Sequence, residues 1–276
     1  MFSGNQNIEL KFWKFPGGER NVKIVSPSDI IRFRSFTLTM AFKGSDDLID
    51  LLLLVNAIRN VDAYTRLRLV VPYFPAARQD RVMTEGEPLA VQVFAQLIES
   101  CGFYEVEVWD PHSDVVAALF PPGKLKVVPQ WQLWQPVLES TFKNHGMDAK
   151  PALLSPDAGA LKKIYKLAKL VDMPVVEAKK VRDVSTGNIT KTEVDSQALS
   201  RYNIIFVVDD ICDGGRTFEE LAKVIREGGY TGKLVLCVTH GIFSKGLDCL
   251  SEYDAIYSIN NMSVENLNLF NFSKKV

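Results

Sequence analysis

The sequence lacks the features that mark several common classes of protein. It has four cysteines and no C-x-x-C spacing, so a disulfide framework and a zinc site are not expected, and we predict free, mostly buried thiols. Its most apolar run, residues 48–58, contains Asp50 and Asn56 and is too short to span a bilayer. No basic segment with an apolar core opens the chain. We therefore expect a cytoplasmic protein without a membrane partner.

An excess of charge of either sign is also missing. The 32 basic and 33 acidic side chains nearly cancel and leave a formal charge of −1. A protein that mainly binds a polyanion normally carries a basic surplus, so no nucleic-acid partner is expected. The sequence has no G-x-x-x-x-G-K-[ST] loop, no protein-kinase motif set and no serine-hydrolase elbow. Any bound phosphate must therefore be held by other elements.

What the chain does contain is a regular alternation of strand-like and helix-like segments. Its 276 residues suffice for one large or two ordinary domains, and 47% of them are apolar, as in globular proteins. Repeated βα units predict mostly parallel sheets covered by helices. The predicted fold class is α/β, with two doubly wound domains at 1–129 and 130–276 joined by a proline- and glycine-containing link at 120–130. The predicted elements are helix 47–60, strand 66–73, helix 89–101, strand 105–109, helix 134–145, strand 152–155, helix 158–170, strand 174–177, strand 204–208, helix 218–227 and strand 234–239.

One stretch, residues 202–218 (YNIIFVVDDICDGGRTF), has the composition of a ligand site. An apolar strand is expected to end at Asp209 and Asp210, and a glycine turn then leads into a helix. Free N–H groups at such a turn bind phosphate, and paired carboxylates accept hydrogen bonds from a vicinal diol. These properties indicate a ribose-phosphate pocket. The structural alternative is an ordinary strand–turn–helix unit in which Thr217 and Glu220 form a capping box.

Further polar motifs follow other predicted strands. Residues 78–81 (RQDR) carry two arginines suited to bidentate binding of phosphate, although a solvated charged loop is the alternative. His112 and Asp157 each follow a strand, and such side chains can hold Mg²⁺, with His112 acting through water. A lone histidine is more often structural.

A polar stretch, residues 183–200, has little apolar periodicity and is predicted to be a mobile functional loop. Lys180 and Arg182 at its root would neutralise charge that develops during phosphoryl transfer. The alternative is a solvated hairpin with scattered charge.

Together these motifs resemble the ribose-phosphate pyrophosphokinase (phosphoribosyl pyrophosphate synthetase) family, in a compact variant shortened at its N-terminus. The resemblance extends from about residue 15 to about residue 250, with the motifs in the family's order. The matching segments are FPGGE at 15–19, ARQDR at 77–81, SPDAG at 155–159, K-x-R at 180–182, DDICDGGRT at 209–217 and THGIFS at 239–244.

The resemblance implies a phosphoribosyltransferase-like fold and transfer of the ATP β,γ-diphosphate to the 1-hydroxyl of ribose 5-phosphate, with Mg²⁺ as cofactor. It implies that Arg78, Gln79 and Asp80 contact ATP in a first, ATP-binding domain. Phe15 and Glu19 would hold the adenine of a neighbouring subunit, which requires a homo-oligomer, a dimer or a hexamer.

The remaining roles also come from the resemblance. His112 would lie near the metal and the ATP phosphates, Asp157 would be the second metal-site residue, and Lys180 and Arg182 would act on the β-phosphorus. The ribose-5-phosphate residues of the second domain would be Asp209 and Asp210 for the hydroxyls and Asp213, Gly214, Gly215, Arg216 and Thr217 for the 5-phosphate.

The sequence departs from the family pattern at several positions. Gly17 replaces the acid of the F-x-D-G-E turn, and Arg216 replaces a small residue, where it either adds a phosphate contact or points outward. The segment before residue 15 has no room for the usual first helix, so a subunit contact is one way to cover that edge of the domain. The final residues, after about 257, are candidates for packing back on the first domain. Two alternatives to an active synthetase stay open: a non-catalytic regulatory homologue and a phosphoribosyltransferase.

Overall fold

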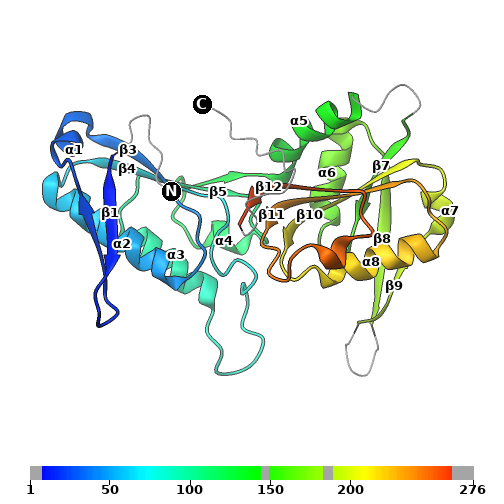
Figure 1. Cartoon of the computed structure of the whole chain (residues 1–276), viewed down its shortest axis with the longest axis horizontal. Helices are drawn as coiled ribbons and strands as arrows, with labels where there is room; N and C mark the ends of the chain where they lie inside the picture. The colour runs from blue at the N-terminus through cyan, green and yellow to red at the C-terminus, as the bar shows by residue number, and fades with distance from the viewer. Residues whose placement is uncertain (1–7, 144–148, 183–188, 263–276) are drawn as a thin grey trace. The chain divides into compact units, whose positions relative to one another are not determined.

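The chain folds into two compact units, Met1–Val128 and Pro129–Val276. The computed structural model describes residues 8–143, 149–182 and 189–262, with only the backbone described at 142–143, 180–182 and 189–191 (Figure 1). Across these ranges, no helix has the length and apolar character needed to cross a bilayer.

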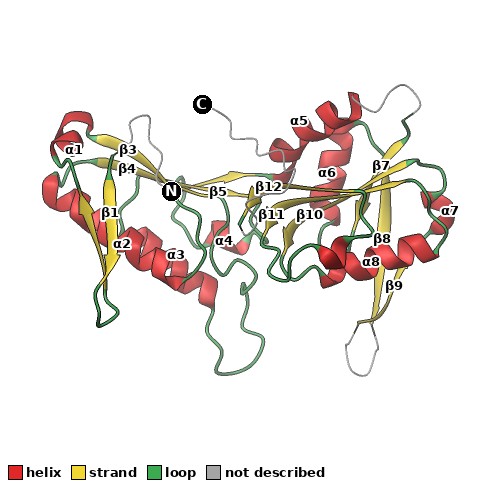
Figure 2. Ribbon diagram, viewed as in Figure 1, coloured by secondary structure: helices red, strands yellow, loops and turns green. Residues whose placement is uncertain are grey.

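The first unit contains a parallel sheet in the order β3-β4-β5-β6 and a separate antiparallel hairpin, β1–β2 (Figure 2). Its elements are β1 (Leu10–Lys14), β2 (Arg20–Ile24), α1 (Ser28–Phe33), β3 (Ser35–Thr39), α2 (Ser45–Val61), β4 (Arg66–Val71), α3 (Ala90–Ser100), β5 (Glu105–Trp109), α4 (Val115–Ala118) and β6 (Leu125–Val128).

The strands of this sheet alternate apolar and polar residues, which gives the sheet two different faces. Leu67 and Leu69 of β4 point into a core that also contains residues of α2 and α3. Arg68, between them in sequence, points to the opposite face and forms ion pairs with Glu105 (2.5 Å) and Glu107 (2.6 Å) of β5. The polar face is thus formed by the charged residues that alternate with apolar ones along β4 and β5.

The second unit contains a six-stranded sheet in the order β12-β11-β10-β7-β8-β9, in which only β9 is antiparallel to its neighbour. Its elements are α5 (Gln130–Lys143), β7 (Pro151–Ser155), α6 (Leu161–Val171), β8 (Val175–Arg182), β9 (Ile189–Val194), α7 (Ser196–Leu199), β10 (Ile204–Cys212), α8 (Arg216–Glu227), β11 (Lys233–Gly241), η1 (Asp248–Leu250) and β12 (Ala255–Asn261).

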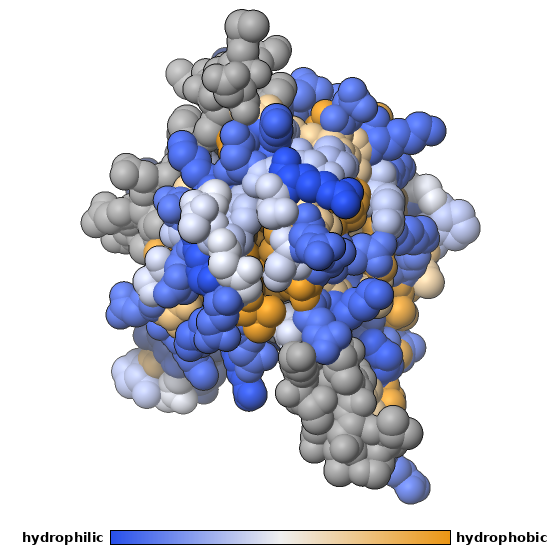
Figure 3. All heavy atoms as spheres, turned by 90° about the vertical axis from the view of Figure 1, so that its right-hand side faces the viewer, coloured by the Kyte–Doolittle hydropathy of each residue, from blue (hydrophilic) through white to orange (hydrophobic). Residues whose placement is uncertain are grey.

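This sheet is buried on both faces, because its central strands are continuous apolar runs. In β10, Phe206 and Val208 face a core shared with α5 and α6, whereas Ile205 and Val207 face a second core shared with α8. The outward surface of this unit is mostly hydrophilic on the side shown in Figure 3. The predicted α/β class with mostly parallel sheets is confirmed.

Several predicted boundaries were wrong. β10 does not end at residue 208 but continues to Cys212, so Asp209 and Asp210 lie within the strand. The predicted link at 120–130 contains β6, which pairs with β5 in the first unit. Helix α8 begins at Arg216 with Gly215 at its N-cap, so Thr217 does not form the capping box.

The predicted loop at 183–200 was also wrong in part. β9 and α7 occupy its second half, and β9 pairs with β8 as one arm of a hairpin. Residues 183–188 lie outside the described part of the chain. The outcome is closer to the hairpin alternative than to an unstructured segment.

Candidate active site

The second unit has a topological switch point between β7 and β10. From β7 the chain crosses through α6 to β8 on one side, whereas from β10 it crosses through α8 to β11 on the other side. β7 and β10 are themselves paired, with Leu154 opposite Val207. Ligands of open α/β sheets bind at the carboxyl ends of strands where the winding direction reverses. Asp157, which follows β7, and Asp209, in the carboxyl-terminal half of β10, are therefore at the expected place for a site.

The switch point holds a group of carboxylates. The backbone N–H of Asp210 donates to Oδ1 of Asp209 at 2.9 Å, while Oδ1 of Asp157 accepts from the backbone N–H groups of Gly159 (3.0 Å) and Ala160 (3.2 Å). Burial, together with the negative charges of Asp210 and Asp157, raises the pKa of Asp209 well above its ordinary value. A strand end with this charge favours ligands that bring hydrogen-bond donors or a cation.

A lysine from α6 partly balances this negative charge. Nζ of Lys163 lies 3.6 Å from Oδ2 of Asp210, whose side chain is 9% exposed. Sequence patterns did not identify Lys163 as a site residue, because it belongs to a run of ordinary surface lysines in an amphipathic helix. Only the packing of α6 against the sheet brings it to the acidic pair.

The glycine turn after β10 leads directly into the first turn of α8. Gly215 is the N-cap residue and has a φ of 78°, a left-handed conformation that glycine adopts readily. The first backbone N–H groups of an α-helix have no partner within the helix, so those of Arg216 and Thr217 are suited to an anion. The Arg216 side chain, in contrast, points along the helix and pairs with Glu220, Nε to Oε1 at 2.7 Å.

A second loop, residues 241–250, packs against this turn. The backbone N–H groups of Ile242 and Phe243 donate to the carbonyl oxygen of Cys212, at 2.8 Å and 3.1 Å. Ser244 donates twice to Asp213, from Oγ to Oδ1 at 2.7 Å and from its backbone N–H to the carbonyl oxygen at 3.2 Å. These hydrogen bonds fix the carboxylate of Asp213 and join the turn after β10 to the loop at 241–250.

Lys180 and Arg182 lie near the end of β8, opposite Thr192 and Ile189 of β9. Their backbone is therefore part of the hairpin, and a bulge separates Val181 from Arg182. Their side chains lie outside the described part of the chain. Their role stays a prediction.

In the first unit, the loops after β4 and β5 emerge at the same edge of the sheet, because these strands are parallel neighbours. The backbone N–H of Gln79 donates to the carbonyl oxygen of Ala76 at 2.8 Å, which forms a tight turn in which Ala76 has a φ of 56°. This turn leaves Arg78 and Gln79 exposed, and Asp80 pairs with Arg81 at 3.4 Å. Two side chains of the predicted ATP-binding motif thus lie at the surface.

Asp110 is the first residue after β5, in the loop beside the one that follows β4, and it lies two residues before His112. It is 1% exposed and has a φ of 39°, an uncommon conformation for a non-glycine residue. Its backbone N–H donates to the carbonyl oxygen of Val128 at 2.8 Å. Strained residues of this kind concentrate at functional sites, and His112, two residues further on, is exposed. Sequence patterns singled out the histidine but not the aspartate.

Phe15 and Glu19 lie at the tip of the β1–β2 hairpin. The backbone N–H of Phe15 donates to the carbonyl oxygen of Glu19 at 2.8 Å, and the Phe15 ring makes an edge contact with Trp13, with centroids 5.9 Å apart. The carboxylate of Glu19 lies against Gly17, where an added Cβ would come within 2.6 Å of Oε2. The glycine that replaces the family's acid therefore makes room for the Glu19 carboxylate.

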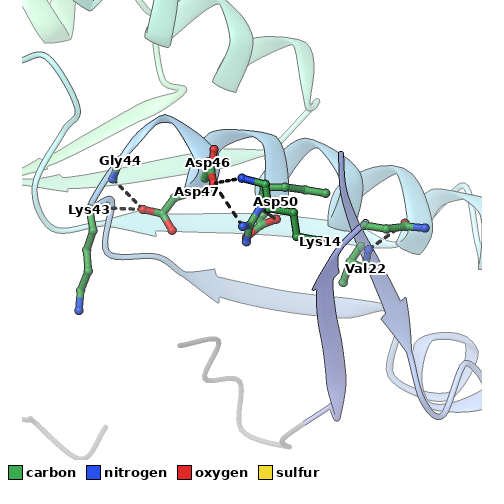
Figure 4. A network of polar contacts seen from close by, with 9 residues as sticks. Lys14, Val22, Lys43, Gly44, Asp46, Asp47 and Asp50 are labelled. Carbon is green, nitrogen blue, oxygen red and sulfur yellow. Dashed lines mark hydrogen bonds and ion pairs between the residues drawn. The ribbon is translucent and has the colours of Figure 1, made fainter. Parts of the chain in front are cut away.

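The last strand pair before the turn of this hairpin, Lys14 and Arg20, is joined to α2 by a group of ion pairs (Figure 4). Arg20 forms a two-pronged pair with Asp50, from Nε at 2.6 Å and from Nη2, and also contacts Asp46 at 3.3 Å. Lys14 approaches Asp46 at 4.0 Å. The hydrogen bond to Asp50 is the main cause that raises the pKa of Arg20. The residues that flank the predicted adenine-binding tip are thus tied to α2.

Within the described ranges, no three His, Cys, Asp or Glu side chains are arranged to hold a metal ion. Mg²⁺ in phosphoryl-transfer sites usually takes only one or two carboxylates and completes its shell with waters and substrate phosphates. The carboxylates of Asp157, Asp209 and Asp210 are hard oxygen donors, and the pKa of Asp209 is raised first by burial and then by the negative charges of Asp210 and Asp157. Hard carboxylate oxygens of this kind fit a metal ion whose shell is completed by water and a phosphorylated substrate.

Comparison with known proteins assigns both units. A model of the N-terminal domain of ribose phosphate pyrophosphokinase matches residues 3–102, and a model of the phosphoribosyl transferase domain matches residues 138–257. A ribose-phosphate pyrophosphokinase from Mycoplasmopsis pulmonis is 30% identical over 236 residues, covering 84% of this chain and 70% of the relative. Its counterpart from Pyrococcus furiosus is 28% identical over 243 residues, covering 87% of this chain and 80% of the relative.

The fold is also similar to a solved structure. The phosphoribosylpyrophosphate synthetase from Mycobacterium smegmatis matches with a TM-score of 0.72 at 21% identity, covering 91% of this chain and 80% of that chain. The predicted phosphoribosyltransferase-like fold is thereby confirmed, as is the family resemblance. The chain belongs to the ribose-phosphate pyrophosphokinase family of enzymes.

Proposed function

We propose that this protein transfers the β,γ-diphosphate of ATP to the 1-hydroxyl of ribose 5-phosphate and releases phosphoribosyl pyrophosphate and AMP. The observation that carries the proposal is the continuity of β10 into α8. Asp209 and Asp210 are followed, on one rigid strand–turn–helix segment, by the N-terminal turn at Gly215. Carboxylates for a diol and N–H groups for a phosphate therefore follow one another along a single segment.

In the second unit, Asp209 and Asp210 bind the ribose hydroxyls. The turn from Asp213 to Thr217 binds the 5-phosphate through backbone N–H groups and the positive end of the α8 dipole. We assign Arg216 to this turn through its backbone alone, since its side chain pairs with Glu220.

In the first unit, the exposed side chains of Arg78 and Gln79 bind ATP phosphates, with Asp80 beside them. His112 contacts the ATP phosphates and their metal. Phe15 and Glu19 bind the adenine of a neighbouring subunit, so the active form is a homo-oligomer. Guanidinium suits the first role because it binds phosphate oxygens in pairs.

The chemistry consists mainly of positioning and charge stabilisation. The 1-hydroxyl oxygen forms a bond to the β-phosphorus and loses its proton to solvent. The bond from that phosphorus to the α,β-bridging oxygen breaks, and AMP leaves with that oxygen. Lys180 and Arg182 neutralise the charge that develops on the transferring group. Mg²⁺, held with the help of Asp157, would supply charge neutralisation of the phosphates.

Two other functions remain as outcomes of the test. A phosphoribosyltransferase shares the acidic pair and the phosphate-binding turn, and the second unit matches that domain model. The first unit, however, matches the N-terminal domain of the pyrophosphokinases, which gives the synthetase the stronger support. A regulatory homologue would bind the substrates without turnover.

The deciding experiment incubates purified protein with ATP, Mg²⁺ and ribose 5-phosphate and follows AMP. We expect AMP and phosphoribosyl pyrophosphate in equal amounts, with Lys180→Ala as the inactive control. Equal AMP from the wild type and this control would refute the proposal. Pyrophosphate release from phosphoribosyl pyrophosphate and a nucleobase would instead identify a phosphoribosyltransferase, and substrate binding without either reaction a regulatory homologue.

A further inference from the structure

The side chain of Lys245 lies along the phosphate-binding turn. A Cβ built on Gly214 would meet three carbons of the Lys245 stem, Cδ at 3.5 Å, Cε at 3.6 Å and Cγ at 3.8 Å. The stem therefore covers the bare backbone of Gly214. Because Nζ is bonded directly to Cε, the ammonium group is held beside this turn.

The loop that carries Lys245 is anchored on both sides of it. Ser244 is hydrogen-bonded to Asp213 through both its hydroxyl and its backbone N–H. The backbone N–H of Gly246 donates to the carbonyl oxygen of Phe243 at 2.9 Å. Only the exposed side chain of Lys245 remains to be ordered by a ligand, which keeps the entropic penalty of binding small.

The other charges at this end of α8 are already paired with each other. Glu219 binds Nζ of Lys223 at 2.7 Å, and Glu220 binds Nε of Arg216 at 2.7 Å. The Lys245 ammonium, in contrast, forms no hydrogen bond or ion pair among the described residues, and its positive charge adds to that of Lys223 in lowering the pKa of Glu219. Its charge is thus available to an anion at the turn.

We propose that Lys245 binds the 5-phosphate dianion of the sugar substrate and sets the selectivity for a phosphorylated over an unphosphorylated sugar. The inference deepens the proposed function and rests on it for the identity of the sugar. The neutral backbone N–H groups of the turn orient the phosphate, and the ammonium supplies the full positive charge that the turn otherwise lacks. Lys245 then acts as a substrate-binding residue at the site.

The test compares Lys245→Met with Lys245→Arg and with Lys233→Met. Methionine keeps an apolar stem over Gly214 but removes the charge. Lys233 is a matched control, because it is also exposed and lies at the start of β11, at the opposite end of the strand from the loop. Thermal unfolding verifies that all variants fold. The measured quantities are KM and kcat for ribose 5-phosphate and the calorimetric Kd of ribose 5-phosphate and of inorganic phosphate.

We expect Lys245→Met to raise the KM and Kd of ribose 5-phosphate about tenfold, the usual effect of losing one charge-assisted hydrogen bond. We expect little change in kcat, partial restoration by Lys245→Arg, and wild-type values for Lys233→Met. The salt dependence of Kd should weaken in Lys245→Met, because one ionic contact is lost.

Unchanged Kd values in Lys245→Met would overturn the inference, as would a wild-type protein that binds neither ribose 5-phosphate nor inorganic phosphate. Wild-type protein that binds ribose 5-phosphate but forms no AMP would instead refute the proposed function. In that case, the ratio of the Kd of ribose 5-phosphate for Lys245→Met to its Kd for the wild type would still decide the role of Lys245. The two failures are therefore distinguishable.

Discussion

Nζ of Lys163 in α6 lies 3.6 Å from Oδ2 of Asp210 in β10. The two residues are far apart in sequence and meet because α6 packs on the sheet beside the switch point. The Lys163 side chain is 30% exposed and that of Asp210 is 9% exposed, so the pair is only partly screened by water. Lys163 thus places a positive charge beside Asp210, whose own negative charge helps to raise the pKa of the neighbouring Asp209.

Replacing Lys163 by methionine should shift the pH dependence of the proposed reaction. Without the ammonium, the raised pKa of Asp209 should rise further, because nearby positive charge favours the ionised carboxylate. The acidic limb of kcat/KM should therefore move to higher pH, by about one unit. Lys163→Arg should restore the wild-type profile. An unshifted limb in Lys163→Met would show that the pair does not control ionisation of the site.

Asp209 should lower the stability of the protein at neutral pH. Its pKa is raised, so between its unfolded and native pKa values the native state binds more protons than the unfolded state. Stability therefore falls as the pH rises through this window, and the penalty is complete above the native pKa. We expect Asp209→Asn to stabilise the protein by about 1 kcal/mol at pH 7, at the cost of substrate binding.

Urea unfolding of Asp209→Asn at pH 7 and near pH 4 provides the measurement. The increase in the free energy of unfolding caused by Asp209→Asn should shrink as the pH approaches the ordinary pKa of an aspartate, about 3.9. Asp248→Asn serves as the control, since Asp248 is an exposed carboxylate in the same unit. If Asp209→Asn and Asp248→Asn increased the free energy of unfolding equally, burial of Asp209 at the switch point would not be the cause of the increase.

The sequence predicts the central strands well because burial leaves a direct trace in it. The run Ile204–Val208 is apolar on both faces, and the strand predicted there exists. The end of that strand was misplaced, since two aspartates look like the start of a loop. Pairing with β11 nevertheless continues through Asp209 and Cys212. Polar residues at the end of a strand can therefore belong to the strand as well as to a ligand site.

Elements with a weak apolar pattern were missed. β3 (Ser35–Thr39) and β12 (Ala255–Asn261) mix polar and apolar residues and become strands through their pairing with β4 and β11. Hydrogen bonds to a neighbouring strand stabilise such segments, and local sequence does not encode them.

Site residues also fall into those that the sequence identifies and those that only the folded structure reveals. Motifs that stand out by composition, such as the acidic pair, could be found from sequence. Lys163 and Lys245 could not, because their relevance depends on which helix or loop packs against the switch point. The conformation of Asp110 likewise depends on its neighbours in the folded sheet.

Gly215 and Gly229 provide a matched pair at the two ends of α8. Both have a positive φ, 78° and 86°, but a Cβ on Gly215 would lie 2.8 Å from Sγ of Cys249, whereas a Cβ on Gly229 would meet nothing within 4 Å. Gly229→Ala should lose about 1 kcal/mol of stability through backbone strain alone. Gly215→Ala should lose about 1–3 kcal/mol more through overpacking, and should also weaken phosphate binding.

Chemical denaturation of the two alanine variants measures this difference. Gly215→Ala in a Cys249→Ala background removes the sulfur that the new methyl group would meet, and should recover part of the extra loss. Equal losses for Gly215→Ala and Gly229→Ala would contradict a close contact between the turn and Cys249.

Arg216 should act on phosphate binding through Glu220. The Arg216 side chain is 86% exposed and pairs with Glu220 at 2.7 Å, so we expect it to mask a carboxylate about one turn from the start of α8. Negative charge there would repel the phosphate dianion even though it suits the helix dipole. Arg216→Met should therefore raise KM for ribose 5-phosphate about two- to fivefold, less than a lost direct contact would.

The double variant Arg216→Met/Glu220→Gln separates an indirect role from a direct one. With the carboxylate removed as well, KM should return close to the wild-type value, because nothing remains to be masked. Both variants retain the backbone N–H of residue 216, so the turn itself is unchanged. Steady-state kinetics at low ionic strength gives the clearest contrast, since the helix end is exposed to solvent. If KM stayed elevated in the double variant, the guanidinium would have to contact the phosphate itself.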